Sequence, residues 1–281
     1  MSHINRHLFY LKKQKMNFKT LFKIGENLNP KQELFTGIAG IAFIVFIWYF
    51  ITSLTGWIGP ATIPSPQSVF LSFGELFKND NLVSNTGYSL FLNFRGYIEA
   101  ISFSIPVGFA IALIPLLNGM FSKPLDALRY VPLTGLIGVF IAWYGIGIPM
   151  KAHFLAFGII VYLLPMVVQR VKETEKVYLD TAWTLGSNNW QLIRKIYMPS
   201  ALSKIFVDIR VITAISWTYI IVAEMVNNEG GVGAMIYSAA KQSRLDKIFA
   251  IIVLIILIGF VQDKLFQILE KVFFKFKFAQ K

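Results

Sequence analysis

The run IAGIAFIVFIWYFITSL, residues 38–54, contains no charged side chain and is apolar on every face of a helix. A second run, FAIIVLIILIGFV at residues 249–261, has the same character. Neither run can form the surface helix of a soluble domain, because such a helix carries a polar face. The whole chain of 281 residues is 55% hydrophobic and only 15% charged, with a mean hydropathy of +0.58. This composition is typical of an integral membrane protein.

Six apolar segments are candidates for membrane-spanning helices, each of which needs about 20 mostly apolar residues. The expected spans are 34–54, 98–117, 130–148, 154–168, 205–226 and 248–262. The fourth and the sixth are short, so we expect them either to be extended by flanking turns or to lie inside the bundle, shielded from lipid. The sequence therefore predicts an all-α polytopic membrane protein, with a basic segment at 1–33 and a transmembrane domain at 34–281.

The 27 lysines and arginines are divided unevenly between the two sides of the membrane. Twenty lie before the first span, after the last span or in the loops on that same side. Five lie in the opposite loops, and Arg95 and Arg210 lie near span ends. Because cytoplasmic segments carry the excess of positive charge, both termini are expected in the cytoplasm. The net charge of +12 is then explained by topology and by contact with anionic lipid, and no nucleic-acid partner is expected.

The chain lacks the residue patterns of common catalytic and cofactor sites. It has no cysteine, and its three histidines are His3, His7 and His153. The metalloprotease pattern HExxH, the phosphate-binding pattern GxxxxGKS/T and the nucleophile pattern GxSxG are all absent from the sequence. We therefore expect no metal site and no cofactor in this chain, and we do not expect it to be an enzyme.

The polar stretch TAWTLGSNNWQLIRKIYMP, residues 181–199, interrupts the apolar sequence between the fourth and fifth spans. Its local signals predict two short helices. Asp180 is expected to cap the first, which Gly186 ends. Asn188, with a glutamine three residues later, is expected to cap the second in a capping box, and Pro199 is expected to end it. On capping alone, an ordinary solvated loop is the simpler interpretation.

The spacing of this stretch resembles the cytoplasmic E-A-A…G…I-x-L-P loop of bacterial ABC importer permeases. The residues that match are Asp180, Thr181, Ala182, Gly186, Ile196 and Pro199. In that family the first short helix docks in a groove on a separate ATPase subunit and carries ATP-driven motion into the membrane. The resemblance implies a coupling loop at 178–200, with ATP bound by the partner subunit.

The resemblance extends from about residue 63 to residue 263 and is to the nitrate, sulfonate, taurine and bicarbonate branch of these permeases. The further matches are Pro64-Ser65-Pro66, Ser89-Leu90, Leu128-Arg129 with Pro132, Trp143 to Gly147, the set Arg210, Trp217 and Glu224, and Gly231-Val232-Gly233. The chain departs from the branch at Leu92, where an arginine is usual, and at Asp208, where a small residue is usual.

Arg210, Trp217 and Glu224 lie in the fifth span and are candidates for the transport pathway or for contact with a binding protein. Glu224 is interpreted either as a polar group at the outer mouth or docking surface, or as a side chain solvated at the membrane interface. Two other pairs of charges are expected to be structural, namely Asp208–Arg210 and Arg95–Glu99.

The resemblance implies a type I ABC importer permease fold in the bacterial inner membrane. It implies a homodimer around a central pathway, two ATPase subunits, and a periplasmic or lipid-anchored binding protein. The solute would be an oxyanion such as nitrate, a sulfonate or bicarbonate, or alternatively a vitamin-precursor heterocycle. An ATP-independent transporter or channel would need mid-membrane carboxylates and an internal repeat, which the sequence does not show. A membrane enzyme would need a catalytic pair, and His153 has no evident partner in the sequence.

Overall fold

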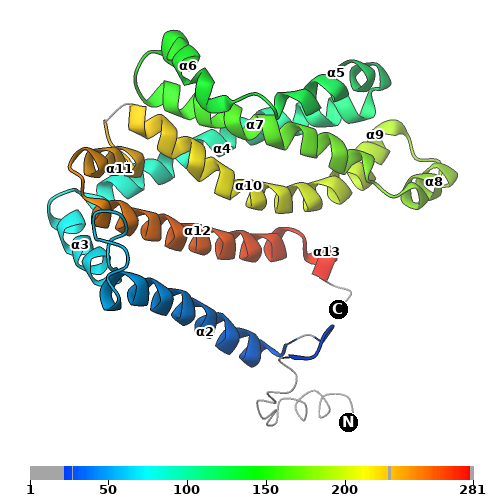
Figure 1. The fold of residues 1–281 in the computed structure, drawn as a ribbon. Helices are drawn as coiled ribbons and strands as arrows, with labels where there is room; N and C mark the ends of the chain where they lie inside the picture. The colour runs from blue at the N-terminus through cyan, green and yellow to red at the C-terminus, as the bar shows by residue number, and fades with distance from the viewer. Residues whose placement is uncertain (1–21, 27, 227–228, 279–281) are drawn as a thin grey trace. The chain divides into compact units, whose positions relative to one another are not determined.

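A computed structural model describes residues 22–26, 28–226 and 229–278, which form helices joined by loops (Figure 1). The chain divides into two compact units, Met1–Ser68 and Val69–Lys281. Most of the basic segment predicted at 1–33, including His3 and His7, lies outside the described residues.

In the first unit, the first predicted span is α2 (Pro30–Tyr49), continued by the π-helical turn η2 (Phe50–Leu54). Asn29 and Gln32 start the helix with a capping box. The Gln32 N–H donates to Asn29 Oδ1 at 2.9 Å, and the Asn29 N–H donates to Gln32 Oε1 at 3.2 Å. Together the two elements make one apolar helix of 25 residues, which is long enough to cross a membrane.

The second unit holds most of α3 and the helices that follow it. The elements are α3 (Pro66–Lys78), α4 (Leu82–Leu113), α5 (Pro115–Leu128), η3 (Leu133–Leu136), α6 (Ile137–Tyr144), α7 (Ile148–Lys172), α8 (Lys176–Thr184), α9 (Asn189–Leu192), η4 (Ile193–Tyr197), α10 (Met198–Val226), α11 (Val232–Lys241), α12 (Leu245–Phe273) and α13 (Lys275–Phe278). Figure 1 shows α8 and α9 at one end of α10 and α11 at the other. We call these the loop end and the far end.

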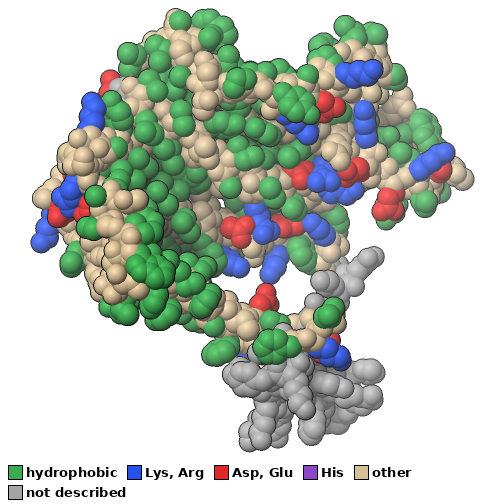
Figure 2. Space-filling view, viewed as in Figure 1, with side chains coloured by type: hydrophobic (Ala, Val, Ile, Leu, Met, Phe, Trp, Pro, Cys, Tyr) green, Lys and Arg blue, Asp and Glu red, His purple; other side chains and the backbone are tan. Residues whose placement is uncertain are grey.

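Helix α7 forms the centre of this unit, packed between α4 and α10. Glycines on α4 let the two helices approach closely. A Cβ at Gly96 would lie 2.8 Å from Leu155 Cδ2, and a Cβ at Gly108 would lie 2.5 Å from Val167 Cγ1. Charged side chains gather near the ends of the helices on the face shown in Figure 2, and apolar side chains cover the middle. This distribution is that of a multi-pass membrane protein.

Five helices of the described residues are long and apolar enough to span a membrane, and the number is six when a bent pair is counted as one span. The two spans predicted to be short are both extended by flanking turns, to 25 residues in α7 and 29 residues in α12. They differ in burial. The most apolar window of α7 is 67% buried, whereas that of α12 is 17% buried. Only α7 is therefore shielded inside this unit.

The third span is not the single helix predicted over residues 130–148. Helix α5 and the η3–α6 segment are bent by 94° and qualify as a span only together. Pro132 lies in the break, and proline both lacks an N–H and disfavours a helical conformation for the residue before it. Gly145, with a φ of +70°, then ends α6.

Candidate functional site

Helix α8, at the loop end, contains the start of the polar stretch at 181–199, which continues through α9 and η4. Its N-cap residue, Glu175, makes no side-chain capping bond. Asp180 lies inside the helix, so its predicted role as the N-cap is wrong. No glycine or proline lies between α7 and Asp180, and the helix therefore begins earlier, at Lys176.

Gly186 ends α8 as the sequence predicts. Its φ is +76°, a conformation that favours glycine. The Gly186 N–H donates to the Trp183 carbonyl at 2.9 Å, and the Ser187 N–H donates to the Ala182 carbonyl at 3.0 Å. No atom lies within 4 Å of the position that a Cβ at Gly186 would take. The backbone conformation, and not the available space, therefore calls for glycine here.

The predicted capping box at Asn188 is confirmed. The Gln191 N–H donates to Asn188 Oδ1 at 2.9 Å, and the Asn188 N–H donates to Gln191 Oε1 at 2.9 Å. The predicted helix end at Pro199 is wrong, because α9 continues through η4 into α10. In the π-helical turn η4, which precedes the proline, N–H groups donate to the carbonyl five residues back instead of four. The Met198 N–H, for example, donates to the Ile193 carbonyl, and this wider turn accommodates the proline ring.

The segment 176–192, which we call the knob, exposes large apolar side chains although it is polar overall. Leu185 is 79% exposed and Trp183 is 54% exposed, while Ala182 faces inward. The other large exposed apolar side chains of the knob are Val177, Tyr178 and Trp190. A groove of about 570 Å³ lies beside the knob, and Thr181, Ala182, Ile196 and Phe276 are among the residues that line it. Such an apolar surface on a polar protrusion is typical of a site that binds another protein.

A cluster of charges fixes the base of the knob to the helices. Arg170, near the end of α7, binds Asp208 of α10 with two hydrogen bonds of 2.7 and 2.8 Å. Arg170 also binds Glu173 at 2.8 Å, and Lys204 lies 3.7 Å from the same carboxylate. The Arg170 guanidinium holds the pKa of Glu173 below its usual value. The predicted pair Asp208–Arg210 is therefore wrong, because Asp208 reaches across to α7.

Asp208→Asn is expected to lower the free energy of unfolding by about 1–3 kcal/mol, because it weakens two charged hydrogen bonds of a nearly buried carboxylate. Thermal unfolding of the purified protein in detergent measures the loss. Asp126→Asn is the matched control, since Asp126 is exposed and forms no ion pair within the residues that the structure describes. Equal stability of the two variants would contradict the assigned role of the Arg170–Asp208 pair.

Two of the candidate pathway residues, Arg210 and Trp217, contact α12. Arg210 forms an ion pair with Asp263. The Trp217 indole N–H donates to Gln262 Oε1 at 2.8 Å, and the Trp217 side chain is buried. Both contacts join α10 to α12.

Glu224, the third candidate, is fully buried at the far end and is not solvated at an interface. Its Oε1 accepts from the Ser89 hydroxyl at 2.6 Å, and its Oε2 accepts from the Gly233 N–H at 2.8 Å. The Ser89 oxygen in turn accepts from the Val232 N–H at 2.9 Å. The Gly231 N–H donates to Asn85 Oδ1 at 2.9 Å. Glu224, Ser89 and Asn85 therefore satisfy the free N–H groups at the start of α11 and join α4, α10 and α11.

Glycine is required at two positions of this contact. Gly231 has a φ of +99°, and a Cβ there would lie 2.2 Å from the Glu224 carboxyl carbon. A Cβ at Gly233 would lie 2.4 Å from the Ile221 carbonyl oxygen. Three separate motifs of the sequence, at residues 89–90, 224 and 231–233, thus meet at one place in the fold.

The structure supplies a partner for His153, which sequence reasoning did not find. His153 Nδ1 lies 2.5 Å from Glu99 Oε1, and the imidazole ring lies 4.5 Å from the ring of Tyr144, between centroids. The predicted pair Arg95–Glu99 is therefore not formed. The Glu99–His153 contact joins α4 to α7.

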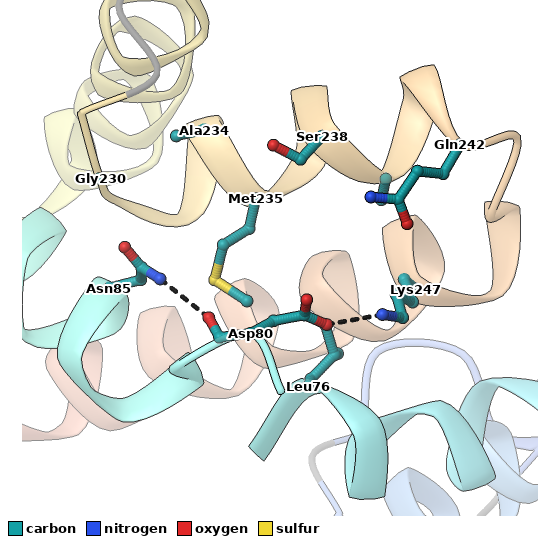
Figure 3. A pocket seen from close by; sticks show the side chains of 10 residues that line it. Leu76, Asp80, Asn85, Gly230, Ala234, Met235, Ser238, Gln242 and Lys247 are labelled. Carbon is teal, nitrogen blue, oxygen red and sulfur yellow. Dashed lines mark hydrogen bonds and ion pairs between the residues drawn. The ribbon is translucent and has the colours of Figure 1, made fainter. Parts of the chain in front are cut away.

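A pocket of about 220 Å³ opens at the far end between α3, α4, α11 and α12 (Figure 3). Lys247 points toward Asp80 on its floor, with a distance of 2.6 Å between Nζ and Oδ2. The Asn85 amide donates to the Asp80 carbonyl at 3.0 Å. Met235 of α11 and Gln242, which directly follows that helix, border the pocket on the opposite side. The far end therefore presents a polar pocket with a paired cation.

Comparison with known proteins places these features in a family. Residues 94–275 match the family described as "Binding-protein-dependent transport system inner membrane component". The chain is 26% identical over 236 residues to the "Putative aliphatic sulfonates transport permease protein SsuC" of Bacillus subtilis, covering 84% of this chain and 85% of the relative. It is 26% identical over 231 residues to the "Taurine transport system permease protein TauC" of Escherichia coli, covering 80% and 84%. It is 25% identical over 197 residues to the "Riboflavin transport system permease protein RibX" of Chloroflexus aurantiacus, covering 70% and 73%.

Solved structures show the same fold. An inward-facing structure of the MetNI methionine ABC transporter has a chain that superimposes with a TM-score of 0.57 at 18% identity, covering 66% of this chain and 94% of that one. A crystal structure of an amino acid ABC transporter with histidines gives a TM-score of 0.53 at 16% identity, covering 73% and 96%. The predicted all-α, type I importer permease-like fold is confirmed.

Proposed function

Because the chain belongs to the family of binding-protein-dependent transport system inner membrane components, we propose that it is the membrane subunit of an ATP-driven importer of a small oxyanion. In this proposal the loop end faces the cytoplasm, where the sequence places most of the positive charge. ATP binds to a separate ATPase subunit, and this chain carries out no covalent chemistry and holds no cofactor.

The knob is the observation that carries the proposal. It protrudes at the loop end, exposes Trp183, Leu185 and Trp190, and is fixed at its base by the Arg170–Asp208 pair. A rigid protrusion with apolar side chains at its tip fits the groove of a partner protein, where aromatic anchors supply most of the binding energy. We assign the coupling loop to residues 178–200, as the sequence predicts.

One continuous helix connects the knob with the far end. From Asn189 to Val226, α9, η4 and α10 form a helix of 38 residues, which at 1.5 Å per residue is about 57 Å long. A displacement of the knob therefore moves the whole rod, including the Glu224 contact with α11. In the proposed alternating-access cycle, ATP binding closes the ATPase pair, the knobs of two permease copies move together, and the pathway opens outward.

The far end is the proposed docking surface for the binding protein. Helix α11 lies there, and Glu224 holds its first turn to α4 and α10. The polar pocket beside α11 offers the Lys247–Asp80 pair to a partner side chain. The pathway itself is proposed to lie between two copies of the chain.

For the solute, the relatives favour a sulfonate. The two relatives named for sulfonate and taurine transport each cover 80% of this chain or more. Nitrate and bicarbonate carriers share the branch that the sequence resembles. A vitamin-like heterocycle is the alternative, because the riboflavin permease relative covers 70% of the chain.

Uptake into vesicles tests the proposal. The permease, its ATPase and its binding protein are reconstituted together, and uptake of taurine, an alkanesulfonate, nitrate, bicarbonate and riboflavin is compared with and without ATP. We expect saturable uptake of one of the oxyanions, with a sulfonate the first expectation, that requires both ATP and the binding protein. Uptake of riboflavin alone would mean that the solute is a heterocycle and not an oxyanion. Equal uptake without ATP would contradict the importer mechanism.

A further inference from the structure

A second pocket lies at the loop end, apart from the knob. It has a volume of about 410 Å³ and lies between α5 and α7. We call it the basic pocket and define it by Ser122, Leu125, Arg129, Pro165, Val168 and Lys172. Arg129 directly follows α5, and Lys172 is the last residue of α7. Lys172 therefore stands where a membrane helix ends, which is the level of lipid headgroups. Arg129 lies in the break between α5 and η3 and lines the same pocket.

The charges that line the basic pocket leave it with an excess of positive charge. Within residues 22–26, 28–226 and 229–278, neither Arg129 nor Lys172 forms an ion pair. Glu173 also borders the pocket, but Arg170 and Gln169 already bind its carboxylate at 2.8 and 2.9 Å. The exposed carboxylate of Asp126 offsets one of the two cations. The pocket therefore keeps a net positive charge.

The basic pocket also holds a hydrogen-bond donor without a partner. The Ser122 hydroxyl lines the pocket and has no partner among the described residues. Buried polar groups in native structures nearly always have a partner, so this hydroxyl is available to donate to a bound molecule that accepts hydrogen bonds.

The rest of the lining is apolar. Leu125 and Val168 are buried core residues, and Pro165 lies beside them on α7. A free phosphate ion gains nothing from such a surface. A phospholipid places its phosphate at the cations and the start of its acyl chains on the apolar floor.

We propose that the basic pocket binds the phosphate of an anionic phospholipid in the leaflet at the loop end. Arg129 and Lys172 bind the phosphate oxygens through charge-assisted hydrogen bonds. The Ser122 hydroxyl donates a further hydrogen bond. The assignment depends on the chain spanning a membrane and is independent of the solute that it carries.

Native mass spectrometry of the full chain tests the site, with phosphatidylglycerol as the probe. Arg129→Gln together with Lys172→Gln is expected to weaken phosphatidylglycerol binding roughly 25-fold, because each variant removes a direct charge-assisted contact with the phosphate that is worth about 1 kcal/mol or more. The matched control is Lys123→Gln together with Lys271→Gln, which removes the same charge from exposed positions outside the pocket. For the control we expect a change of less than about threefold.

Two further measurements refine the test. One separates the hydrogen bond of Ser122 from the effect of charge, and the other separates a lipid from a free phosphate compound. Ser122→Ala keeps the charge and is expected to weaken binding about three- to tenfold through the lost hydrogen bond. Glycerol phosphate is expected not to displace the lipid at equal concentration. Equal binding by the pocket variant and the control would overturn the site. Displacement by glycerol phosphate would overturn the assignment to a lipid.

Discussion

Gly231→Ala is expected to unfold or strongly destabilise the permease, with a loss of about 4–6 kcal/mol in the free energy of unfolding. The new Cβ would lie 2.2 Å from the carboxyl carbon of the buried Glu224. Alanine would also be forced into a φ of +99°, which L side chains rarely adopt. The side chain of Glu224 must then move and give up its bonds to Ser89 and Gly233.

Thermal unfolding in detergent and the yield of membrane-inserted protein measure this effect. The matched control is Gly138→Ala, because Gly138 has an ordinary φ and no atom within 4 Å of its Cβ position. We expect the control to change the free energy of unfolding by less than about 1 kcal/mol. If Gly231→Ala proves as stable as Gly138→Ala, Glu224 does not hold α11 as described.

Trp183→Ala combined with Leu185→Ala is expected to reduce ATP-driven uptake to background while the protein stays folded. Both side chains are more than half exposed, so their loss removes little of the permease core. Each is an apolar anchor at the tip of the knob, and truncation of such anchors typically costs 2 kcal/mol or more in binding. The affinity for the ATPase subunit should therefore fall about 100-fold or more.

Two measurements test the Trp183→Ala, Leu185→Ala prediction, namely pull-down of the ATPase subunit and uptake into vesicles. Tyr130→Ala is the control, because Tyr130 is 90% exposed and lies between α5 and η3, away from the knob. It removes a large exposed aromatic ring without touching the proposed contact. Normal uptake by the Trp183, Leu185 double variant would mean that the ATPase does not bind the knob through these side chains.

Local and compositional signals in the sequence were sufficient for much of the fold. The spans follow from uninterrupted apolar runs, and the capping box at Asn188 and the helix end at Gly186 depend on residues within a few positions of each other. The broken third span was missed because α5, on the N-terminal side of Pro132, carries Lys123 and Asp126 and so resembles a polar loop in the sequence.

Long-range contacts could not be predicted from one sequence. Asp208 binds Arg170, which is 38 positions away, rather than its neighbour Arg210. Glu224 and Ser89 are 135 positions apart, so their motifs were recognised separately and their contact was not. The second span was predicted to begin at residue 98, whereas α4 begins at Leu82. Asn85 and Ser89 lie in this earlier part of α4, and their polar groups bind the start of α11.

The central claim is that the knob lies in the cytoplasm and is bound by the ATPase subunit. The chain contains no cysteine, so Leu185→Cys provides a single thiol at a position of the knob that is 79% exposed. A membrane-impermeant maleimide should label this thiol only from the cytoplasmic side, and a bound ATPase subunit should block the labelling. Labelling from outside intact cells, or equal labelling with and without the ATPase, would contradict the account.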